Sequence, residues 1–399
     1  MKLTIEDKLI LAGSKLYLTE KDIQYIEDMI PSVTNWNNFT DMVIQNGVGP
    51  LIHKNFSLIK NSTLIPEGSL SRFKQTYYRC ISRNMVLYEY FRNAVDSFSK
   101  VGISVIALKG ISLAESIYSD IGLRQMSDID LLVKKEDIEK CRNLLLDMGY
   151  KYTEVYKSDF IKELDLPKHY PPLVLNGVSI ELHAKVHFDN PDFSVNIDDY
   201  WKRSQPIILS NMSVQSLSIE DNIQYLCLHL NEHFNEGKPQ LYSIVDISEV
   251  IKKYHSKINW EFFLESCNKY NCSSIVFKYL SLIRKYFDAN IPDHILSGNF
   301  MPNIDVRTEK LFIYYLHHFR KDFPLGITNQ NIEVYRNVKG FRNKTIYLVN
   351  DLFPSRKFMY KRYRVKKKYL LFWYYILRLG TGIYQIFLQI IRKIIPSAK

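Results

Sequence analysis

The sequence predicts an α+β fold in which a small mixed β-sheet lies between two helical regions. Apolar residues recur at helical spacing through residues 1–100 and again through 215–350, whereas residues 101–188 alternate short apolar runs with helical segments. We therefore divide the chain into an N-terminal helical region at 1–100, a core at 101–210, a C-terminal helical region at 211–351 and a basic tail at 352–399.

The N-terminal region is expected to be helical throughout. Helical spacing of apolar residues runs through Phe39–Ile52 and through Leu70–Val101. The second stretch carries an aromatic stripe made of Tyr77, Tyr78, Tyr88, Tyr90 and Phe91. Such a stripe is more typical of a buried core than of a platform that stacks bases.

The core is predicted to begin with a strand, a turn and a helix. Ile103–Leu108 has the pattern of a short buried strand, which stops at Lys109 and Gly110, and Ile111–Tyr118 follows as a short helix with Ser112 in its first turn. Backbone N–H groups point outward at a helix N-terminus, and a glycine turn lets them approach a ligand. With the charge of Lys109 added, this segment predicts a site for an anion.

Two aspartates follow in the run SDIDLLV. Asp128 and Asp130 are two residues apart, and alternate residues of a strand share a face, so we expect both carboxylates to point the same way. Two unpaired anions side by side are costly to bury, and Mg²⁺ removes that cost while it also binds phosphate oxygens. Arg124 can hold phosphate oxygens in a fork. An anion site followed by an arginine and two paired aspartates suits a complex of metal and nucleoside triphosphate. The alternative is a pair of strand-end aspartates that face solvent.

A third carboxylate is expected on a β-hairpin. Leu173–His187 consists of two short apolar runs around Asn176 and Gly177, which is a strong signal for a type I′ turn. The second run carries Glu181 and His183 on one face. Glu181 beside the paired aspartates would complete a two-metal site, and we expect His183 at the rim of that site, near phosphate or a metal-bound water. The alternative for Glu181 is an exposed position on an edge strand.

These segments carry a family resemblance. The order LKG, GLRQMSDIDLLV and IELH resembles the bacterial family of uncharacterised nucleotidyltransferases, within the polymerase-β-like superfamily. The likeness extends upstream to FTDMVIQNGVGPLIHKNF and downstream to YLCLHLNEHF, LYSIVDISEVI and LFPSRKFMYKRY. The superfamily usually has Gly-Ser before the helix, whereas this chain has Lys109-Gly110 with Ser112 nearby. The resemblance implies a polymerase-β-like sheet and metal-dependent nucleotidyl transfer, and it implies no particular acceptor.

We therefore expect transfer of a nucleoside monophosphate from a nucleoside triphosphate to a hydroxyl or phosphate acceptor, with release of pyrophosphate. Asp128, Asp130 and Glu181 are expected to hold two Mg²⁺ or Mn²⁺ ions, and Glu181 to receive the acceptor's proton. The residues expected to position the triphosphate are Lys109, Gly110, Ser112, Arg124 and His183.

The acceptor stays open, and so do three alternatives. The enzyme could serve a peptide or polysaccharide pathway, with a small molecule, peptide or saccharide as acceptor. It could be a toxin-like enzyme that modifies a macromolecule such as RNA or protein, although the neutral body of the chain argues mildly against this. It could also be a nucleotide-binding module without turnover, against which the intact Asp128, Asp130 and Glu181 argue.

The composition is that of a globular protein. Of 399 residues, 46% are apolar and 24% are charged, and the length suffices for two or three domains. The N-terminal segment MKLTIEDKLILAGSKLYL predicts an amphipathic helix rather than an export signal. The scattered cysteines predict reduced thiols in a cytoplasmic protein. They are Cys80, Cys141, Cys227, Cys267 and Cys272.

Other polar residues of the C-terminal region are expected to be structural. His229 and His233 share a helix face but lack the H-E-x-x-H order, so packing or contact with substrate is favoured over a zinc site. Asp246 lies inside the apolar run IVDISEV. It is expected to cap a helix or to pair with a basic residue.

The net charge of +11 is confined to the tail. Residues 1–351 hold 41 Lys and Arg against 42 Asp and Glu, whereas residues 352–399 hold twelve basic residues and no acidic one. Arg356–Lys368 alone contains eight of these basic residues. A polar stripe then follows along an otherwise apolar helix, formed by Arg378, Thr381, Gln385, Gln389 and Arg392.

Two interpretations of the tail remain open. In the first, the polar stripe faces water and the helix packs on the helical body. In the second, the helix lies in an anionic membrane surface, where each basic residue contributes about 1 kcal/mol, and the protein is peripheral to the membrane. A membrane span is not expected, because Arg378 would lie near its middle.

Overall fold

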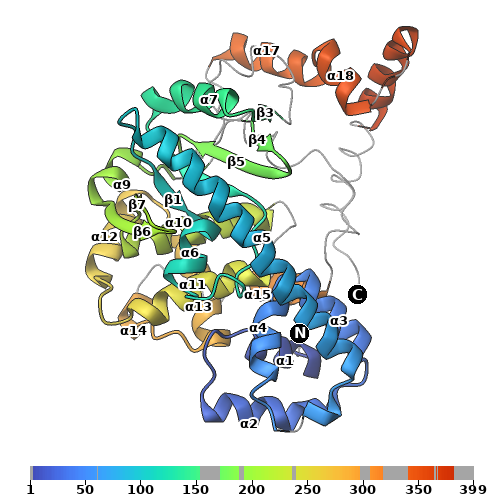
Figure 1. Cartoon of the computed structure of the whole chain (residues 1–399), viewed down its shortest axis with the longest axis vertical. Coiled ribbons are helices and arrows are strands. Elements are labelled where there is room, and N and C mark those ends of the chain that lie inside the picture. The colour runs from blue at the N-terminus through green and yellow to red at the C-terminus, as the bar shows by residue number, and fades with distance from the viewer. Residues whose placement is uncertain are drawn as a thin grey trace.

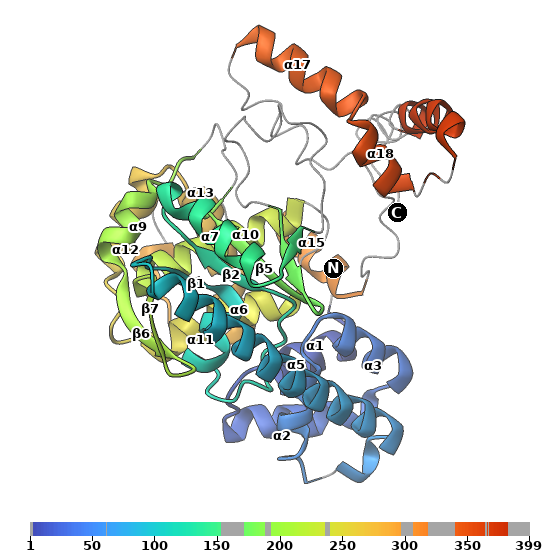
Figure 2. The same cartoon turned by 45° about the horizontal axis from the view of Figure 1, so that its top comes forward.

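The computed structural model describes residues 3–60, 62–152, 171–187, 193–235, 240–296, 306–317, 340–363, 365 and 367–381. It is a mixed α/β structure in which one seven-stranded sheet lies among many helices, as the sequence predicts. Figure 1 shows the sheet in the middle of the molecule, with the N-terminal helices at one end and the helices of the tail at the other. In Figure 2, the long helix α5 (Glu67–Ser99) runs from the N-terminal helices across the sheet.

The N-terminal region is helical. Its elements before α5 are α1 (Ile5–Gly13), α2 (Glu20–Met29), α3 (Trp36–Gln45) and α4 (Gly49–Phe56), with 3-10 helices at Ile30–Ser32 and Ser62–Leu64. Helical spacing runs without a break over Phe39–Ile52, but the structure divides this stretch at Gly47. That glycine has a φ of +72°, and an added Cβ would lie 2.5 Å from the ring of Tyr242, on α11 (Leu241–Tyr254). The chain therefore turns at Gly47 to fit against α11.

The seven strands have the order β3-β4-β5-β2-β1-β7-β6. They are β1 (Ile106–Leu108), β2 (Ile129–Leu132), β3 (Lys151–Tyr152), β4 (Leu173–Leu175), β5 (Val178–His183), β6 (Gln205–Leu209) and β7 (Met212–Ser216). The pairs β2–β5 and β1–β7 are parallel, and the other neighbouring strands are antiparallel. The central strands β1 and β2 are thus flanked on both sides by strands that come much later in the chain.

Two hairpins extend the sheet, and the sequence analysis anticipated one of them. Asn176 and Gly177 have φ values of +49° and +78° between β4 and β5, which is the predicted type I′ geometry. The second hairpin, β6–β7, was not anticipated. Its turn at Ser210 and Asn211 has φ values of +49° and +64°. The signal was present as Ser-Asn between two short apolar runs, and the predicted boundary at residue 210 falls inside this turn.

The remaining helices precede or follow the strands. They are α6 (Lys109–Ser116), α7 (Ile138–Asp147), α9 (Ile197–Arg203), α10 (Ile219–Asn235), α12 (Trp260–Lys269), α13 (Ser273–Phe287), α14 (Asp293–Leu296) and α15 (Val306–His317), with a 3-10 turn at Lys135–Asp137. Helix α6 begins two residues before the predicted start at Ile111. As a result, Lys109 and Gly110 belong to its first turn and join it directly to β1.

The central strands of the sheet are buried on both faces. Ala107, Leu131 and Ile180 belong to a core with residues of α5 and α7. Leu108 and Leu132 belong to a larger core, which also contains residues of the N-terminal helices and of α10, α11 and α13. Alternate residues of a strand face opposite sides. Residues that share a face with Leu132 therefore point toward the C-terminal helices.

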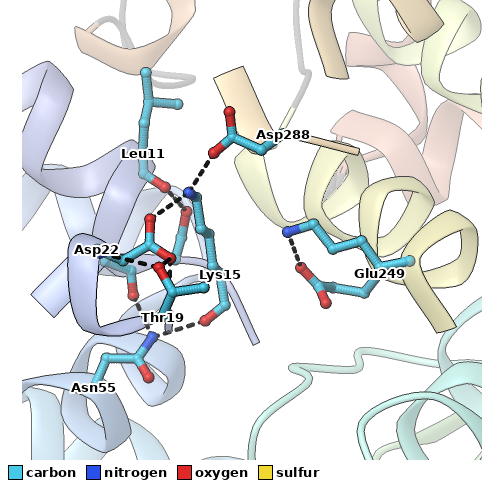
Figure 3. Close-up of polar contacts among 10 residues, drawn as sticks. Leu11, Lys15, Thr19, Asp22, Asn55, Glu249 and Asp288 are labelled. Atoms are coloured by element: carbon cyan, nitrogen blue, oxygen red, sulfur yellow. Dashed lines mark hydrogen bonds and ion pairs between the residues drawn. The ribbon is translucent and has the colours of Figure 1, made fainter. Parts of the chain in front are cut away.

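A buried lysine ties the N-terminal helices to the C-terminal ones. Lys15 Nζ lies 2.6 Å from Oδ1 of Asp22 and 2.6 Å from Oδ2 of Asp288, which follows α13 (Figure 3). Burial acts to lower the pKa of Lys15, but the two carboxylates raise it above the usual value. Burial acts to raise the pKa of Asp22, but hydrogen bonds from Lys15 and Thr19 hold it below the usual value. Lys15 and Asp22 are therefore both charged at neutral pH.

The end of the C-terminal helical region and the tail form helices that lie apart from the sheet in both views (Figures 1 and 2). They are α17 (Phe341–Leu352), α18 (Arg356–Tyr363), a 3-10 turn at Lys368–Leu370 and a helical segment at 371–381. Of the polar stripe, Gln385, Gln389 and Arg392 lie outside the described residues. Arg378 does not face water as the first interpretation expected, because its Nη2 donates to the carbonyl oxygen of Asp351 at 2.9 Å.

None of the helices in the described ranges combines the length and the apolar character that crossing a bilayer requires.

Lys15→Met should lower the free energy of unfolding by about 2 kcal/mol, because Asp22 loses a charge-assisted hydrogen bond. The folded-state pKa of Asp22 is lowered, so its pairing stabilises the fold above the usual aspartate pKa, and this stabilisation is lost as the pH falls through the folded-state value. Lys15 stays charged throughout this range. The difference between wild type and Lys15→Met should therefore shrink between about pH 7 and pH 3.

Urea unfolding followed by circular dichroism at the two pH values measures this difference. Lys21→Met is the control, because Lys21 is an exposed lysine of α2. A difference that did not change with pH would contradict the assigned role of Asp22.

Candidate active site

Asp130 lies at the centre of the candidate site, in the middle of the sheet. It is on β2, where the register pairs it with Leu108 of β1 on one side and with Glu181 of β5 on the other. Lys109 follows Leu108, and His183 lies two residues beyond Glu181 on the same face. Strand pairing therefore brings four polar residues from three separate segments to one place. Asp130 shares a face with Leu132, so this group points toward the C-terminal helices.

The contacts converge on one carboxylate oxygen. Lys109 Nζ donates to Oδ1 of Asp130 at 2.8 Å, and Nε2 of His183 lies 2.8 Å from the same oxygen. The same His183 nitrogen is 3.7 Å from Oε2 of Glu181. The sequence analysis placed His183 at the rim of the site, but its side chain is fully buried, with 0% of its surface exposed. Glu181 is half-buried, so it is the carboxylate of this pair that faces the more open side.

The buried charges stabilise one another. Burial alone would raise the pKa of Asp130, but Lys109 and His183 hold it well below its usual range. Burial alone would lower the pKa of Lys109, but Asp130, with Tyr225, Asp128 and Glu181, raises it well above its usual range. Both members of the Lys109–Asp130 pair are therefore ionised at neutral pH. An ionised carboxylate inside the sheet is a strong acceptor for cations.

The turn that carries Lys109 is strained. Lys109 has a φ of +48°, a left-handed conformation that costs a non-glycine residue about 1–2 kcal/mol. Gly110 follows it, and an added Cβ there would lie 2.8 Å from Nη1 of Arg124 and 2.8 Å from Cγ of Met126. The pair Lys109-Gly110 thus allows β1 to pass into α6 without a loop while the lysine reaches Asp130. Ser112 lies buried in the first turn of α6.

Asp128 lies beside this group rather than in it. The sequence analysis placed both aspartates on the strand, but β2 begins at Ile129, so Asp128 is in the bend before it. Its Oδ1 accepts a hydrogen bond from Oγ of Ser127 at 3.0 Å. Burial and the charge of Asp130 raise its pKa above the usual value. The charge of Asp130 therefore acts on Asp128, although Asp130 lies on β2 and Asp128 lies in the bend before it.

The donor set suits a divalent cation. Asp130, Glu181 and His183 each offer one ligand atom, and these atoms lie within 4.8 Å of one another; no other such group of three occurs among the described residues. Two carboxylate oxygens suit Mg²⁺ or Mn²⁺, whereas imidazole is more typical of later transition metals. The sequence analysis predicted Asp128, Asp130 and Glu181 as the metal ligands, whereas this group of possible ligands has His183 in the place of Asp128. The signal for His183 was its position two residues after Glu181 on the same strand.

Arg124, which was predicted to hold the triphosphate, pairs with a carboxylate of the C-terminal region in this structure. Its Nε and Nη2 contact the carboxylate of Asp246 on α11 at 3.2 and 2.6 Å, and Nη1 donates to the carbonyl oxygen of Gln125. The guanidinium also lies 4.5 Å from the ring centroid of Tyr242. Tyr118 donates from its hydroxyl to Asp246 at 2.7 Å. The pairing of Asp246 with a basic residue is confirmed, and Arg124 anchors the loop before β2 to α11.

Helix α10 contributes a tyrosine that sequence reasoning missed. The Tyr225 hydroxyl is buried and has no hydrogen-bond partner among the described residues. Burial raises the pKa of Tyr225, with Lys109 acting against this and Asp130 adding to it, which places the hydroxyl near both. Its ring stacks on that of His229 at 6.0 Å, and Nε2 of His229 lies 2.9 Å from Nε2 of His233. The spacing 225, 229, 233 on one helix face was the available signal.

One family model matches the part of the chain that holds this site. A family model described as "uncharacterised nucleotidyltransferase" matches residues 32–288, a range that contains every residue of the candidate site. Among solved structures, the antibiotic-resistance factor ANT(2'')-Ia is similar over 52% of this chain and 95% of its own, with 11% sequence identity and a TM-score of 0.30, which is too low to carry an argument. No curated protein matches the chain in sequence. The family match spans more than half of the chain, and the chain therefore belongs to the family of uncharacterised nucleotidyltransferases.

Proposed function

We propose that this protein transfers a nucleoside monophosphate from a nucleoside triphosphate to a hydroxyl or phosphate acceptor and releases pyrophosphate. The observation that carries the proposal is the convergence of Asp130 and Glu181, on adjacent strands, with Lys109 at the start of α6. This arrangement combines carboxylates for a divalent cation with a fixed positive charge for phosphates. Family membership supports the same chemistry.

Asp130 and Glu181 are the oxygen donors that would hold Mg²⁺ or Mn²⁺, with Asp128 and His183 beside them. Such an ion, when bound, neutralises charge on the triphosphate and lowers the pKa of the attacking hydroxyl. Asp130 is suited to this role because it stays ionised while buried. His183 orients the carboxylate of Asp130 through the 2.8 Å contact between Nε2 of His183 and Oδ1 of Asp130.

Lys109 is the residue that we assign to the triphosphate. Its ammonium group lies beside the metal-binding carboxylates, where it offsets negative charge that builds on the phosphates in the transition state. The first-turn amides of α6, at Gly110 and Ser112, offer N–H groups to the same phosphates. Arg124 acts as a positioning residue, because its guanidinium packs against Gly110 and is itself held by Asp246.

Glu181 and Tyr225 complete the proposed mechanism. Glu181 is half-buried and adjacent to Asp130, so it accepts the proton of an acceptor hydroxyl as that oxygen attacks the α-phosphorus. Tyr225 donates its unused hydroxyl hydrogen to a phosphate oxygen when nucleotide is bound. In this proposal the nucleotide lies between the sheet and α10.

The proposal is tested with each labelled nucleoside triphosphate in Mg²⁺ or Mn²⁺, against panels of saccharides, peptides, RNA and the protein itself. Pyrophosphate release with transfer of label identifies both nucleotide and acceptor class. A saccharide or peptide acceptor places the enzyme in a biosynthetic pathway, and label on RNA or protein identifies a macromolecule-modifying enzyme. Binding without turnover would make the protein a nucleotide-binding module, and absence of binding would refute the proposal.

Asp128→Asn and Asp130→Asn should each reduce nucleotide transfer to background, because both remove charge from the proposed metal site. Asp130→Asn should also lower thermal stability, since Lys109 stays buried without its counter-charge. Asp147→Asn is a matched control on the exposed side of α7. Pyrophosphate release and circular dichroism measure the two effects, and near wild-type turnover by either site variant would exclude the metal site proposed here.

Lys109→Met should weaken binding of nucleoside triphosphate by about 1–3 kcal/mol, roughly 5- to 150-fold, because a charge-assisted contact is lost. Asp246→Asn should lower stability by breaking the pair with Arg124, and it should weaken nucleotide binding less than Lys109→Met does, because Arg124 acts only by positioning the turn at Gly110. Calorimetric titration measures both variants. A loss of affinity as large as that of Lys109→Met would contradict a role for Arg124 that is limited to positioning this turn.

Tyr225→Phe should leave the fold intact, since the hydroxyl has no partner among the described residues, and should lower kcat/KM about tenfold by removing a phosphate contact. Tyr150→Phe is the matched control, because Tyr150 also buries a hydroxyl that has no partner in the part of the chain that the structure describes, but it lies in the core between the sheet and α7. Equal activity of the two variants would remove Tyr225 from the site.

A further inference from the structure

The last described helix of the tail has an apolar face that is open to solvent. Tyr369, in the 3-10 turn just before this helix, continues the same face. The side chains concerned have exposed fractions of 43% to 69% and belong to Tyr369, Phe372, Trp373, Ile376 and Leu377. These positions are spaced i, i+3, i+4, i+7 and i+8, which places them on one side of a helix. We call this set the apolar face. Single exposed aromatic residues are ordinary on a protein surface, whereas a continuous row of large apolar side chains is typical of a surface that meets a partner.

The opposite side of the same helix is held by polar contacts. Tyr375 donates from its hydroxyl to the carbonyl oxygen of Pro354, and Arg378 Nη2 donates to that of Asp351 at 2.9 Å. The Arg378 guanidinium also lies 5.7 Å from the ring centroid of Phe358. The one charged residue of the described helix therefore points toward α17 and α18. This orientation is the reverse of a soluble amphipathic helix, because the polar side packs inward and the apolar face points outward.

The surroundings of the apolar face carry one sign of charge. Arg362, Lys367 and Lys368 are exposed just before it, and no acidic residue occurs in residues 352–399. Asp351, the nearest acidic residue in the sequence, contacts Arg378. An apolar face with a positive border complements a layer of acyl chains beneath anionic headgroups. A second copy of this chain, docked through the same face, would place two positively charged borders against each other.

We propose that the apolar face docks the protein on an anionic lipid surface. Phe372 and Trp373 enter the boundary between headgroups and acyl chains, where aromatic side chains are enriched, and Lys367 and Lys368 contact lipid phosphates. The eleven described residues at 371–381 make a helix of about 16 Å, which lies in the plane of the surface. The inference is independent of nucleotidyl transfer, because it uses no residue of the candidate active site.

Co-sedimentation of the full chain with vesicles tests the proposal. We expect binding to vesicles of phosphatidylcholine with phosphatidylglycerol that weakens with salt, and little binding to phosphatidylcholine alone. Phe372→Ser with Trp373→Ser should weaken binding on the order of tenfold, because two large apolar side chains no longer leave water. The control is Tyr78→Ser with Met85→Ser, which removes two exposed apolar side chains from α5.

Two further variants separate charge from apolar contact. Lys367→Glu with Lys368→Glu should weaken binding at least as much as the apolar variant. Lys21→Glu with Lys257→Glu changes the net charge equally at exposed positions of the body and should bind more tightly than the tail variant. Brominated lipid should quench the fluorescence of the wild type, and this quenching should fall in Trp373→Phe.

The proposal is overturned if the full chain does not bind anionic vesicles at low salt, or if the apolar variant binds as the wild type does. It is also overturned if the chain self-associates in solution and Phe372→Ser with Trp373→Ser abolishes that association, since a second copy would then cover the apolar face. Nucleotide binding measured in the same variants reports folding, and we expect it to be unchanged.

Discussion

An ionised carboxylate in the middle of a β-sheet is the constraint on which this structure depends. Asp130 has neighbours on both sides that are set by strand pairing, so it cannot turn toward water. A buried anion is tolerated only with compensating charge and hydrogen bonds. Lys109 and His183 supply both, and Lys109 reaches its place through a left-handed backbone conformation that only surrounding contacts can sustain. A residue under this much constraint is expected where chemistry is done.

The outer contacts of the site follow from the same constraint. The Lys109-Gly110 turn is tight enough that Arg124 packs against the glycine, and Arg124 is then itself a buried charge. Asp246 neutralises it from α11, and Tyr118 donates to the same carboxylate. A chain of buried charge pairs therefore links the sheet to the C-terminal helices.

Much of this arrangement could be predicted from local sequence. Asn176-Gly177 determines a turn through backbone preference alone, and Glu181 and His183 share a face because strand geometry has a period of two. Asp130 and Lys109 were recognisable from their places at the end of apolar runs. Local sequence does not determine which distant residue a side chain contacts in the folded protein. Arg124 has the same chemistry whether it meets phosphate or Asp246, and only the position of α11 decides between them. The burial of His183 beside Asp130, the hydroxyl of Tyr225 and the contact of Arg378 with Asp351 have the same origin, because each depends on an element that lies elsewhere in the sequence.

The contact between Lys15 and Asp288 joins residues 273 positions apart, and β1 pairs in parallel with β7 across more than a hundred residues. Chains dominated by such distant contacts fold slowly, because loop-closure entropy is lost before the contacts form. During synthesis, the N-terminal helices would leave the ribosome long before the segment that completes their core. Until residue 288 emerges, Lys15 lacks one of its two carboxylates and α1 lacks its contact with α13. The side of α1 that contacts α13 therefore stays uncovered in the nascent chain for a period whose length is set by the rate of translation.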